Sequence, residues 1–525
     1  MRPKGYLALV LHAHLPFVRH PEHEDFLEED WLYEAITECY VPLIRLFESL
    51  ARDGVPFRLT LSVSPTLASM LQDPLLQSRY VRRLERLTEL AERELERARL
   101  HQPLHRLALM YRERFETARA IWDACGGDLT VPLRRLQHEG RLEIIASAAT
   151  HAFLPLMNGC ESSVRAQVRV GYEHSRRVFG QTPHGMWLPE CGYEPAIEPA
   201  LKECGIQYFI LDAHGLLFAA PRPRFGVYAP VKCPSGVAAF ARDIEASRQV
   251  WSALEGYPGD PVYREFYRDV GYELDYDYIR PYLHSDGVRR TVGLKYYRIT
   301  GPTEDKELYD PEAARARADQ HAEHFLTSRI QQVKHLFTIT RKEPIIVAPY
   351  DAELFGHWWF EGPDWLELLI RRLCAQDILE MITPADYLER HPDLQPVQPA
   401  ASSWGWKGYN EMWLEGSNDW IYPHLHRISQ HMASLARRYP HAHGLLRRAL
   451  NQAAREVLLA QGSDWAFIMK TGTFTDYAAR RTREHVERFE RLSTQIRSGG
   501  IDDSWLAEVE ARDNIFPELD YSVFR

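Results

Sequence analysis

Short apolar runs recur along the first 390 or so residues, and each ends in a cluster of polar residues. Stretches with helical spacing of apolar positions lie between several runs, at Glu34–Leu50, Tyr80–Phe115 and Glu312–Ile339. Buried strands that alternate with helices are typical of a parallel sheet. The runs that we predict to be strands are Tyr6–His12, Phe57–Val63, Leu142–Ala149, Gly185–Leu188, Ile206–Leu211, Val237–Phe240, Ile345–Ala348 and Leu379–Ile382.

The polar clusters lie where the functional residues of an α/β barrel are expected. In such a barrel, functional side chains follow the carboxyl ends of the strands. The pattern therefore predicts an α/β fold with a barrel of seven or eight strands. An open parallel sheet follows a similar rule, so the pattern alone does not decide whether the sheet closes.

Two regions interrupt the alternation of strands and helices. Pro221–Pro234 and Trp251–Tyr297 are rich in Tyr, Pro, Gly and Asp, and loops this long in an enzyme are usually functional. We expect them to form a small subdomain or lid, at about residues 215–300, inserted in a catalytic domain at 1–392. A Pro-rich linker then leads to a Trp-rich loop and to helical patterns, which predict a C-terminal helical domain at 400–525.

Composition excludes several classes of function. The net charge of the 525 residues is -10 and both signs are interspersed, which argues against a nucleic-acid partner. No window approaches the roughly 18 apolar residues of a membrane helix, so no membrane partner is expected. The seven cysteines include no CxxC pair, which is typical of reduced thiols in a cytoplasmic protein.

Two carboxylates each follow a predicted strand and lie among aromatic residues. Glu190 belongs to Trp187-Leu-Pro-Glu-Cys-Gly-Tyr193, and Asp351 begins a segment that ends in Gly-His-Trp-Trp359. Glycosidic bond chemistry needs two carboxyl groups that flank the bond. A single carboxylate at such a place often only caps the next helix. Two of them in aromatic surroundings favour an acid/base and nucleophile pair.

Histidines also gather at strand ends. His12 and His14 are alternate residues of one strand and so share a face, while His151 and His214 follow other strands. With Asp243 and Asp351 they could bind a metal ion for hydrolysis. They could equally donate hydrogen bonds to sugar hydroxyls, or be a structural pair. The residues by themselves leave these alternatives open.

Five ordered motifs carry a resemblance to a known family. The chain resembles glycoside hydrolase family 57 over nearly its whole length, and within it the 1,4-α-glucan branching enzymes. The long third and fourth motifs are the most specific. The motifs are His12-Ala-His-Leu-Pro16, Ala149-Thr-His151, Trp187-Leu-Pro-Glu-Cys-Gly-Tyr193, Pro349-Tyr-Asp-Ala-Glu-Leu-Phe-Gly-His-Trp-Trp359 and Ser463-Asp-Trp-Ala-Phe467.

The resemblance implies a fold and a set of roles. It implies an incomplete (β/α)7 barrel, a distorted relative of the TIM barrel, with a small inserted domain and a helical C-terminal domain. It implies retention of anomeric configuration without a metal or other cofactor, with Glu190 as nucleophile and Asp351 as acid/base. Tyr228 would match a mobile-loop tyrosine that favours transfer over hydrolysis. The expected substrate-binding residues are His12, His14, His151, Trp31, His214, Tyr228, Arg242, Trp251, Trp358, Trp404, Trp413 and Asp464.

The expected activity is branching of an α-glucan. The enzyme would cleave α-1,4 linkages and form α-1,6 branches, with amylose or glycogen as donor and acceptor, and would be a monomer or a weak homo-oligomer. An α-amylase or 4-α-glucanotransferase of the same family would use the same carboxylates. More distant alternatives are a metal-dependent deacetylase or amidohydrolase and a non-catalytic glucan-binding protein.

Overall fold

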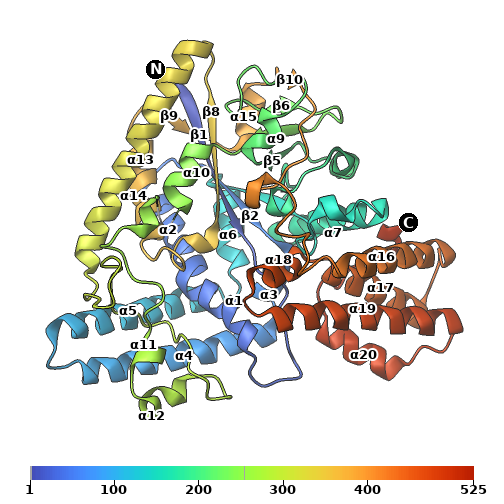
Figure 1. Cartoon of the computed structure of the whole chain (residues 1–525), viewed down its shortest axis with the longest axis horizontal. Helices are drawn as coiled ribbons and strands as arrows, with labels where there is room; N and C mark the ends of the chain where they lie inside the picture. The colour runs from blue at the N-terminus through green and yellow to red at the C-terminus, as the bar shows by residue number, and fades with distance from the viewer. Residues whose placement is uncertain (1–2, 253–254) are drawn as a thin grey trace.

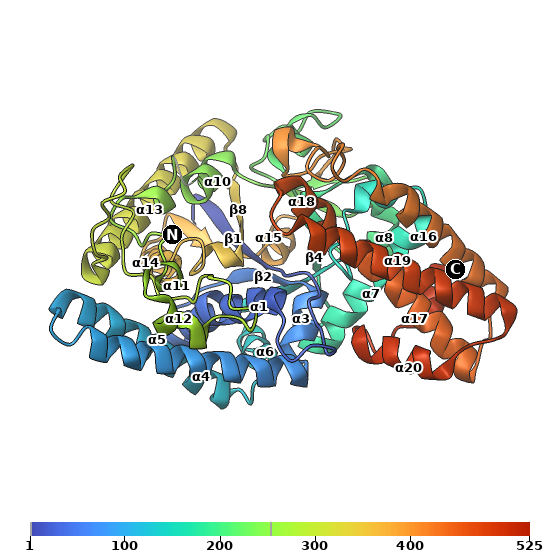
Figure 2. The same cartoon turned by 60° about the horizontal axis from the view of Figure 1, so that its bottom comes forward.

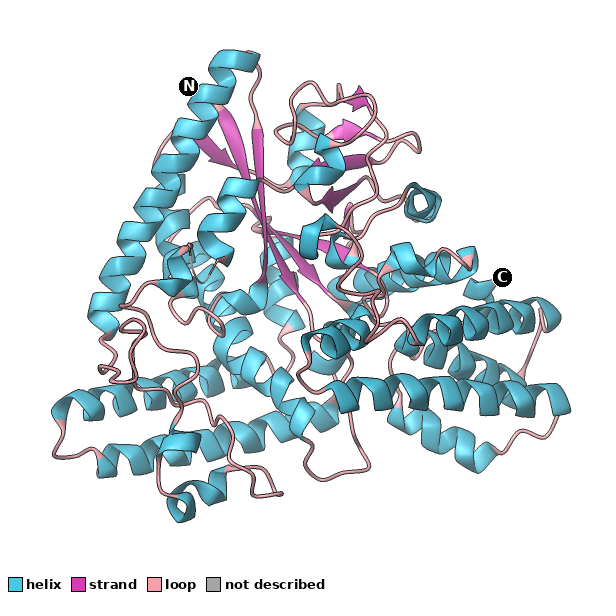
Figure 3. Ribbon diagram, in the orientation of Figure 1, coloured by secondary structure: helices cyan, strands magenta, loops and turns pink. Residues whose placement is uncertain are grey.

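The computed structural model describes residues 3–252 and 255–525. The residues left out, 1–2 and 253–254, fall inside the predicted catalytic domain and its insertion. Each of the eight apolar runs overlaps a parallel strand, and these strands lie in the centre of the molecule with helices outside them (Figure 3). Their bounds are β1 Gly5–Ala13, β2 Leu59–Val63, β3 Leu142–Ser147, β4 Gly185–Trp187, β5 Tyr208–Leu211, β7 Ala238–Ala241, β8 Ile345–Asp351 and β9 Leu379–Met381.

Seven of these strands form a ring. Their order is β7-β5-β4-β3-β2-β1-β8. The ring closes where Arg242, just after β7, pairs in parallel with Val347 of β8, and the Asp243 amide donates to the Val347 carbonyl at 2.8 Å. The short strand β9 pairs with the first residues of β1, outside the ring. The predicted (β/α)7 barrel is therefore confirmed.

The burial of the strands explains their composition. All nine residues of β1 are buried, and so are six of the seven in β8. Because helices cover the outer face and side chains fill the inner face, a continuous apolar run satisfies both sides of a parallel strand. Two further short strands, β6 Val231–Lys232 and β10 Gln395–Pro396, extend the sheet beyond β7.

One predicted helical stretch, Tyr80–Phe115, is two helices in the structure. These are α4, Pro74–Arg97, and α5, Gln102–Ala124, which lie side by side (Figure 1). The break comes at His101, whose side chain accepts a hydrogen bond from the Leu104 amide and caps α5. The predicted stretch Glu34–Leu50 overlaps α1, Asp30–Ala35, and α2, Val41–Arg52, and Glu312–Ile339 lies within α13, Pro311–Thr340.

The long excursion after β7 packs on the α4–α5 hairpin. It begins with α10, Ile244–Trp251, and contains α11, Val270–Glu273, and α12, Tyr276–Ile279, which lie beside α4 and α5 (Figure 2). Tyr278 donates a hydrogen bond to Glu94 of α4 at 2.8 Å, and Tyr111 of α5 donates to the Lys295 carbonyl at 2.8 Å. These contacts hold the excursion against a rigid pair of helices.

The last quarter of the chain, beyond the barrel, is mostly helical. After α14, Gly362–Cys374, and α15, Pro384–Arg390, a loop leads to five helices on one side of the barrel (Figure 1). No helix in the described part of the chain is long and apolar enough to cross a membrane. The five helices are α16 Ile421–Arg438, α17 Gly444–Ala460, α18 Ser463–Thr471, α19 Thr475–Ser498 and α20 Asp503–Arg512.

Candidate active site

Polar side chains lie next to one another at the carboxyl ends of the barrel strands. His12 of β1 lies opposite Ser62 of β2 on one side and opposite Asp351 of β8 on the other. Ser147 of β3 lies opposite Trp187 of β4. The turn that follows β4 carries Glu190. The two candidate carboxylates therefore rise from the same end of the barrel.

Glu190 lies in a tight turn with an unusual backbone. Its φ is +62° and that of Cys191 is +50°, in the left-handed region that side chains other than glycine rarely adopt. Its Oε2 accepts a hydrogen bond from Trp404 Nε1 at 2.8 Å, and its Oε1 accepts one from Ser463 Oγ at 3.1 Å. Burial raises the pKa of Glu190, and these two donors oppose that rise because they stabilise the ionised carboxylate.

Asp351 ends β8 in a contrasting environment. Burial, followed by the negative charges of Glu353 and Glu190, raises its pKa well above the ordinary value, and only Arg242 acts in the opposite direction. Glu353 is held by Tyr40 Oη at 2.6 Å and by the His14 amide at 3.1 Å. No hydrogen-bond donor to the Asp351 carboxyl group occurs among the described side chains. When the two carboxyl groups hold one proton between them, that proton is therefore favoured on Asp351 and the negative charge on Glu190.

Three histidine rings are stacked beside the carboxylates. The rings of His14 and His151 are 3.7 Å apart, and His12 Nε2 lies 2.9 Å from His151 Nε2. Ser62 Oγ and Ser64 Oγ lie 3.0 and 2.8 Å from the Nδ1 atoms of His12 and His14. Burial lowers the pKa of His12 and of His151 well below the ordinary value, so both rings are neutral near pH 7.

The C-terminal helices contribute directly to this site. Helix α18 begins with Ser463 and Asp464, and Asp464 Oδ1 lies 3.0 Å from His14 Nε2. Burial by itself would lower the pKa of His14, but the charge and hydrogen bond of Asp464 outweigh it and raise that pKa. The barrel and the C-terminal helices are therefore joined by the His14–Asp464 pair and by the hydrogen bond from Ser463 to Glu190.

An aromatic wall lies next to Glu190. The Trp404 ring meets the rings of Trp187 and Trp251 edge-on, with centroids 5.0 and 5.9 Å away. The Arg242 guanidinium lies 5.9 Å from the Trp404 ring and pairs with Asp212. His214 Nδ1 is 3.0 Å from Asp212. The predicted residues that these contacts bring together are Glu190, Asp351, His12, His14, His151, His214, Arg242, Trp251, Trp404 and Asp464.

Two predicted substrate contacts are not supported by the structure. The Trp413 side chain is 1% exposed and stacks on Phe153 at 4.3 Å, so neither face of the ring is open to a sugar. The Tyr228 carbonyl accepts a hydrogen bond from the amide of Ile345, the first residue of β8. Asp351 is six residues further along β8, about 20 Å away at the rise of a strand, so Tyr228 lies at the opposite end of the barrel.

The other two predicted contacts lie outside the cluster of histidines and carboxylates. Trp31 packs edge-on against Phe474 and Tyr477 at 5.3 and 5.9 Å, at the junction with α19. Trp358 is 56% exposed and stacks on Phe266 at 4.6 Å. Its open face is available to a long ligand, whereas Trp31 has a structural contact.

Comparison with known proteins identifies the family. Residues 8–398 match the family model described as glycosyl hydrolase family 57. The chain belongs to glycosyl hydrolase family 57. Residues 424–524 also match the C-terminal region of 1,4-alpha-glucan branching enzymes.

The relatives carry two different activities in their names. A 1,4-alpha-glucan branching enzyme of Thermococcus kodakarensis is 34% identical over 98% of this chain and 77% of its own length. A solved branching enzyme from Pyrococcus horikoshii is 34% identical with a TM-score of 0.89, covering 99% of this chain and 97% of the other. A solved alpha-amylase, AmyC from Thermotoga maritima, is 44% identical with a TM-score of 0.93, covering 100% and 99%.

Several residues of this family 57 site were missed by sequence reasoning. Ser463 donates to Glu190, Glu353 adds charge next to Asp351, and Asp212 holds Arg242. Ser62 and Ser64 orient two histidines. A signal was present for the two serines, which alternate at the end of a predicted strand as His12 and His14 do.

Metal-ligating atoms also meet in this family 57 site. One nitrogen each of His14 and His151 and an oxygen of Asp464 lie within 4.8 Å of one another. Asp464 already bonds to His14 and raises its pKa, and the resulting proton competes with a metal ion for the ring. A second group, Glu456, His485 and Asp513, is buried among the C-terminal helices, where Arg488 pairs with Asp513 at 2.9 Å.

Proposed function

We propose that this chain is a 1,4-α-glucan branching enzyme that retains anomeric configuration. The proposal rests on two carboxyl groups at one end of the barrel with opposite hydrogen-bonding environments. The 34% identical relatives that are named branching enzymes support it, because they cover nearly the whole chain. The substrate is an α-glucan that serves as both donor and acceptor.

The reaction proceeds in two displacements. Asp351 donates its proton to the glycosidic oxygen as the bond to the anomeric carbon breaks, and a Glu190 carboxylate oxygen bonds to that carbon. The hydroxyl group at carbon 6 of an acceptor glucose then gives its proton to Asp351. Its oxygen attacks the anomeric carbon, and Glu190 leaves as a carboxylate. The Asp464 carboxylate, which pairs with His14, accepts hydrogen bonds from hydroxyl groups of the bound sugar.

A second candidate activity is hydrolysis, since the 44% identical relative from Thermotoga maritima is named an alpha-amylase. The chemistry differs only in the acceptor, which is water in an amylase. The aromatic wall, with Trp251 and Trp404, favours a sugar acceptor. It removes water from the side of Glu190 and offers flat rings to a glucose unit, and Arg242 lies beside it.

Incubation with linear amylose tests the proposal. Proton NMR should show new α-1,6 linkages while few new reducing ends appear. Reducing ends without α-1,6 linkages would make the enzyme an amylase, and redistributed chain lengths with neither signal would make it a 4-α-glucanotransferase. Glu190→Gln should reduce turnover by at least about a thousandfold while glucan binding persists.

The same assay tests the need for a metal. The proposed steps use side chains alone, so dialysis against EDTA should leave the rate of branching unchanged. A loss of activity that zinc restores would contradict the two-carboxylate mechanism and favour metal-assisted hydrolysis at His14, His151 and Asp464.

We further propose how the chain is organised and where it works. The division is a catalytic domain at 1–392, with an insertion at about 215–300, and a helical domain at 400–525. All seven cysteines are free, which supports a reducing, cytoplasmic location. The enzyme acts as a monomer or a weak homo-oligomer. Size-exclusion chromatography with light scattering tests the last point.

A further inference from the structure

A cavity of about 710 Å³ lies at the end of the barrel opposite to Glu190 and Asp351. Residues that directly precede β8, Lys342 to Pro344, line one side of it, and the segment from His391 to Pro396 lines another. Pro223 to Lys232 completes the wall. This volume is typical of a site for a small molecule, and the cavity shares no residue with the candidate active site.

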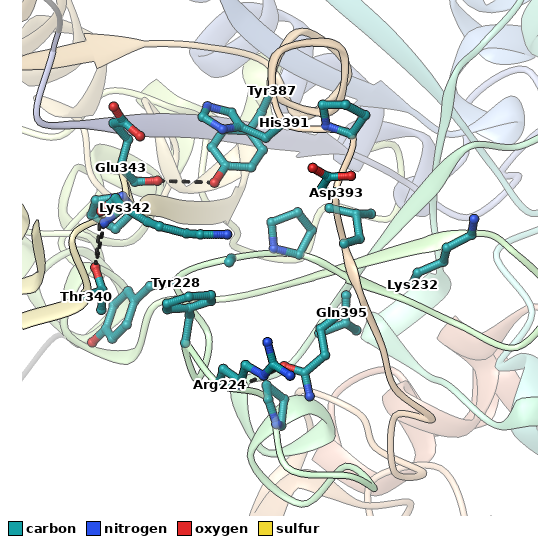
Figure 4. Close-up of a pocket in the computed structure, with 18 of the residues that line it drawn as sticks. Arg224, Tyr228, Lys232, Thr340, Lys342, Glu343, Tyr387, His391, Asp393 and Gln395 are labelled. Atoms are coloured by element: carbon teal, nitrogen blue, oxygen red, sulfur yellow. Dashed lines mark hydrogen bonds between the residues drawn. The ribbon is translucent and has the colours of Figure 1, made fainter.

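The walls of the cavity are stiff and partly aromatic. Five prolines line it, and the fixed φ of proline reduces the freedom of these loops. Three aromatic residues, Phe225, Tyr228 and Tyr387, also line it. The Tyr387 hydroxyl donates to the Glu343 carbonyl at 3.2 Å and so holds the segment before β8 (Figure 4). A ring-shaped ligand can therefore stack here without ordering a flexible loop.

Cationic groups exceed anionic groups around the cavity. Arg224, Lys232 and Lys342 make no ion pair within residues 3–252 and 255–525, whereas Arg390 pairs with Glu380 at 2.8 Å. The Lys342 ammonium lies 5.2 Å from the Phe225 ring and points into the cavity, while the Glu343 carboxylate points away from it (Figure 4).

The remaining charge in the wall belongs to Asp393, which can accept a hydrogen bond from a sugar hydroxyl. In a chain with a net charge of -10, a basic cavity of this kind is a local exception.

We propose that this cavity binds a phosphorylated ring compound, either a sugar phosphate or a nucleotide. The guanidinium of Arg224 and the ammonium of Lys342 bind the phosphoryl oxygens, because charge-assisted hydrogen bonds to phosphate are the strong ones. The ring of the ligand stacks on Phe225 or Tyr228. An uncharged glucan would leave the excess of cations without a partner, so the electrostatics favour a phosphorylated ligand.

A ligand in the cavity would contact residues that are hydrogen-bonded to β8, the strand that ends at Asp351. The Tyr228 carbonyl accepts the amide hydrogen of Ile345, which begins β8, and Asp351 ends that strand. Tyr228 Oη also accepts from Gln332 Nε2 at 3.3 Å, and Gln332 bonds to Asp243 next to the ring closure.

Isothermal titration of the full-length protein tests the proposal with defined probes. Glucose 1-phosphate, ADP, inorganic phosphate and maltose are titrated separately at low salt. Glucose 1-phosphate or ADP should bind at least about tenfold more tightly than maltose. A tenfold difference in Kd corresponds to the free energy of about one charge-assisted hydrogen bond. Whichever of the two binds more tightly identifies the ring. Two results would overturn the proposal: no heat with any phosphorylated probe up to millimolar concentration, or maltose binding that Lys342→Met weakens as much as it weakens binding of the phosphorylated probes.

Variants assign the binding to this cavity. Lys342→Met keeps the apolar stem of the side chain and removes its charge, so it should weaken binding by about tenfold. Lys334→Met is the matched control, because Lys334 is an exposed lysine of the preceding helix that does not line the cavity, and its affinity should equal that of the wild type. Both variants should keep the wild-type rate on amylose, which shows that they fold. Unchanged affinity in Lys342→Met would place the ligand elsewhere and refute the assignment.

Discussion

At the scale of single residues, two hydrogen-bond donors determine which carboxyl group carries the negative charge. Trp404→Phe keeps an aromatic ring but removes the N–H that donates to Glu190 at 2.8 Å. The ionised form of Glu190 loses support, so its pKa rises. In the proposed mechanism Glu190 attacks as a carboxylate, so the acid limb of kcat/KM against pH should move upward by about one pH unit.

The control for this prediction is also a tryptophan of the aromatic wall. The indole N–H of Trp251 has no hydrogen-bond partner within the described residues, so Trp251→Phe should leave the acid limb in place. Ser463→Ala should act as Trp404→Phe does, because it removes the donor to the other oxygen of Glu190. The alkaline limb, where Asp351 loses its proton, should stay unchanged in all three variants. An acid limb that does not move in Trp404→Phe would show that Glu190 is not the group that titrates there.

Sequence reasoning predicted the two carboxylates but not the groups that differentiate them. Glu190 and Asp351 were accessible because each directly follows an apolar strand. Trp404 was predicted to hold glucan, yet its bond to Glu190 spans 214 positions, and that of Ser463 spans 273. The resemblance implied that Trp413 contacts the glucan, whereas the folded loop turns this ring into the core. Contacts of this range depend on tertiary packing, which local patterns do not encode.

At the scale of elements, the strands were predicted closely and the helices less so. A strand buried on both faces must be apolar at every position, and the polar residues at its end mark the rim of the barrel. The spacing of apolar positions continues across the break between α4 and α5, so it did not reveal the turn between them. His101 lies in this turn and caps α5. The closure of the ring was also hidden, because a single pair, Arg242 with Val347, forms it.

Helix α18 yields a prediction about stability. Asp464 raises the pKa of His14 in the folded protein, so the pair stabilises the fold below about pH 6.5, the ordinary histidine value, and this contribution is lost as pH rises through the raised pKa. Asp464→Asn should therefore lower Tm more at pH 5.5 than at pH 9, where His14 is neutral in both proteins. Each unit by which the pKa of His14 falls corresponds to about 1.4 kcal/mol. Calorimetry at the two pH values measures this difference.

His14→Gln is the matched variant for α18, because it removes the titrating group and keeps a polar side chain. Its Tm deficit relative to the wild type should shrink at high pH, and the double variant should add little to either single change. Equal Tm deficits of Asp464→Asn at both pH values would mean that the pair stays neutral and only the hydrogen bond matters.

At the scale of the whole molecule, the two ends of the barrel have separate chemistry. The carboxyl ends hold Glu190, Asp351 and the aromatic wall, and the amino ends hold the basic cavity with Tyr228. The choice between a sugar and a water acceptor must be made where the glycosyl group is held. In the proposed mechanism that place is beside Glu190, next to Trp251 and Trp404, whose ring centroids lie 5.9 Å apart, whereas the Tyr228 backbone lies about a strand length from Asp351.

This arrangement predicts which aromatic residue controls the outcome of the reaction. Trp251→Ala opens space beside Trp404 and admits water to the glycosyl ester on Glu190. The ratio of reducing ends to new α-1,6 linkages should rise by about threefold or more, which corresponds to about 0.7 kcal/mol between the two barriers. Tyr228→Phe should leave this ratio unchanged, because its hydroxyl accepts a hydrogen bond from Gln332 of α13 and makes none to Glu190 or Asp351 within the described residues. If Tyr228→Phe increased hydrolysis as much as Trp251→Ala, the segment from Pro221 to Tyr228 would have to cross the length of β8 during turnover. Full transfer activity in Trp251→Ala would assign the exclusion of water to Trp404 and Arg242 instead.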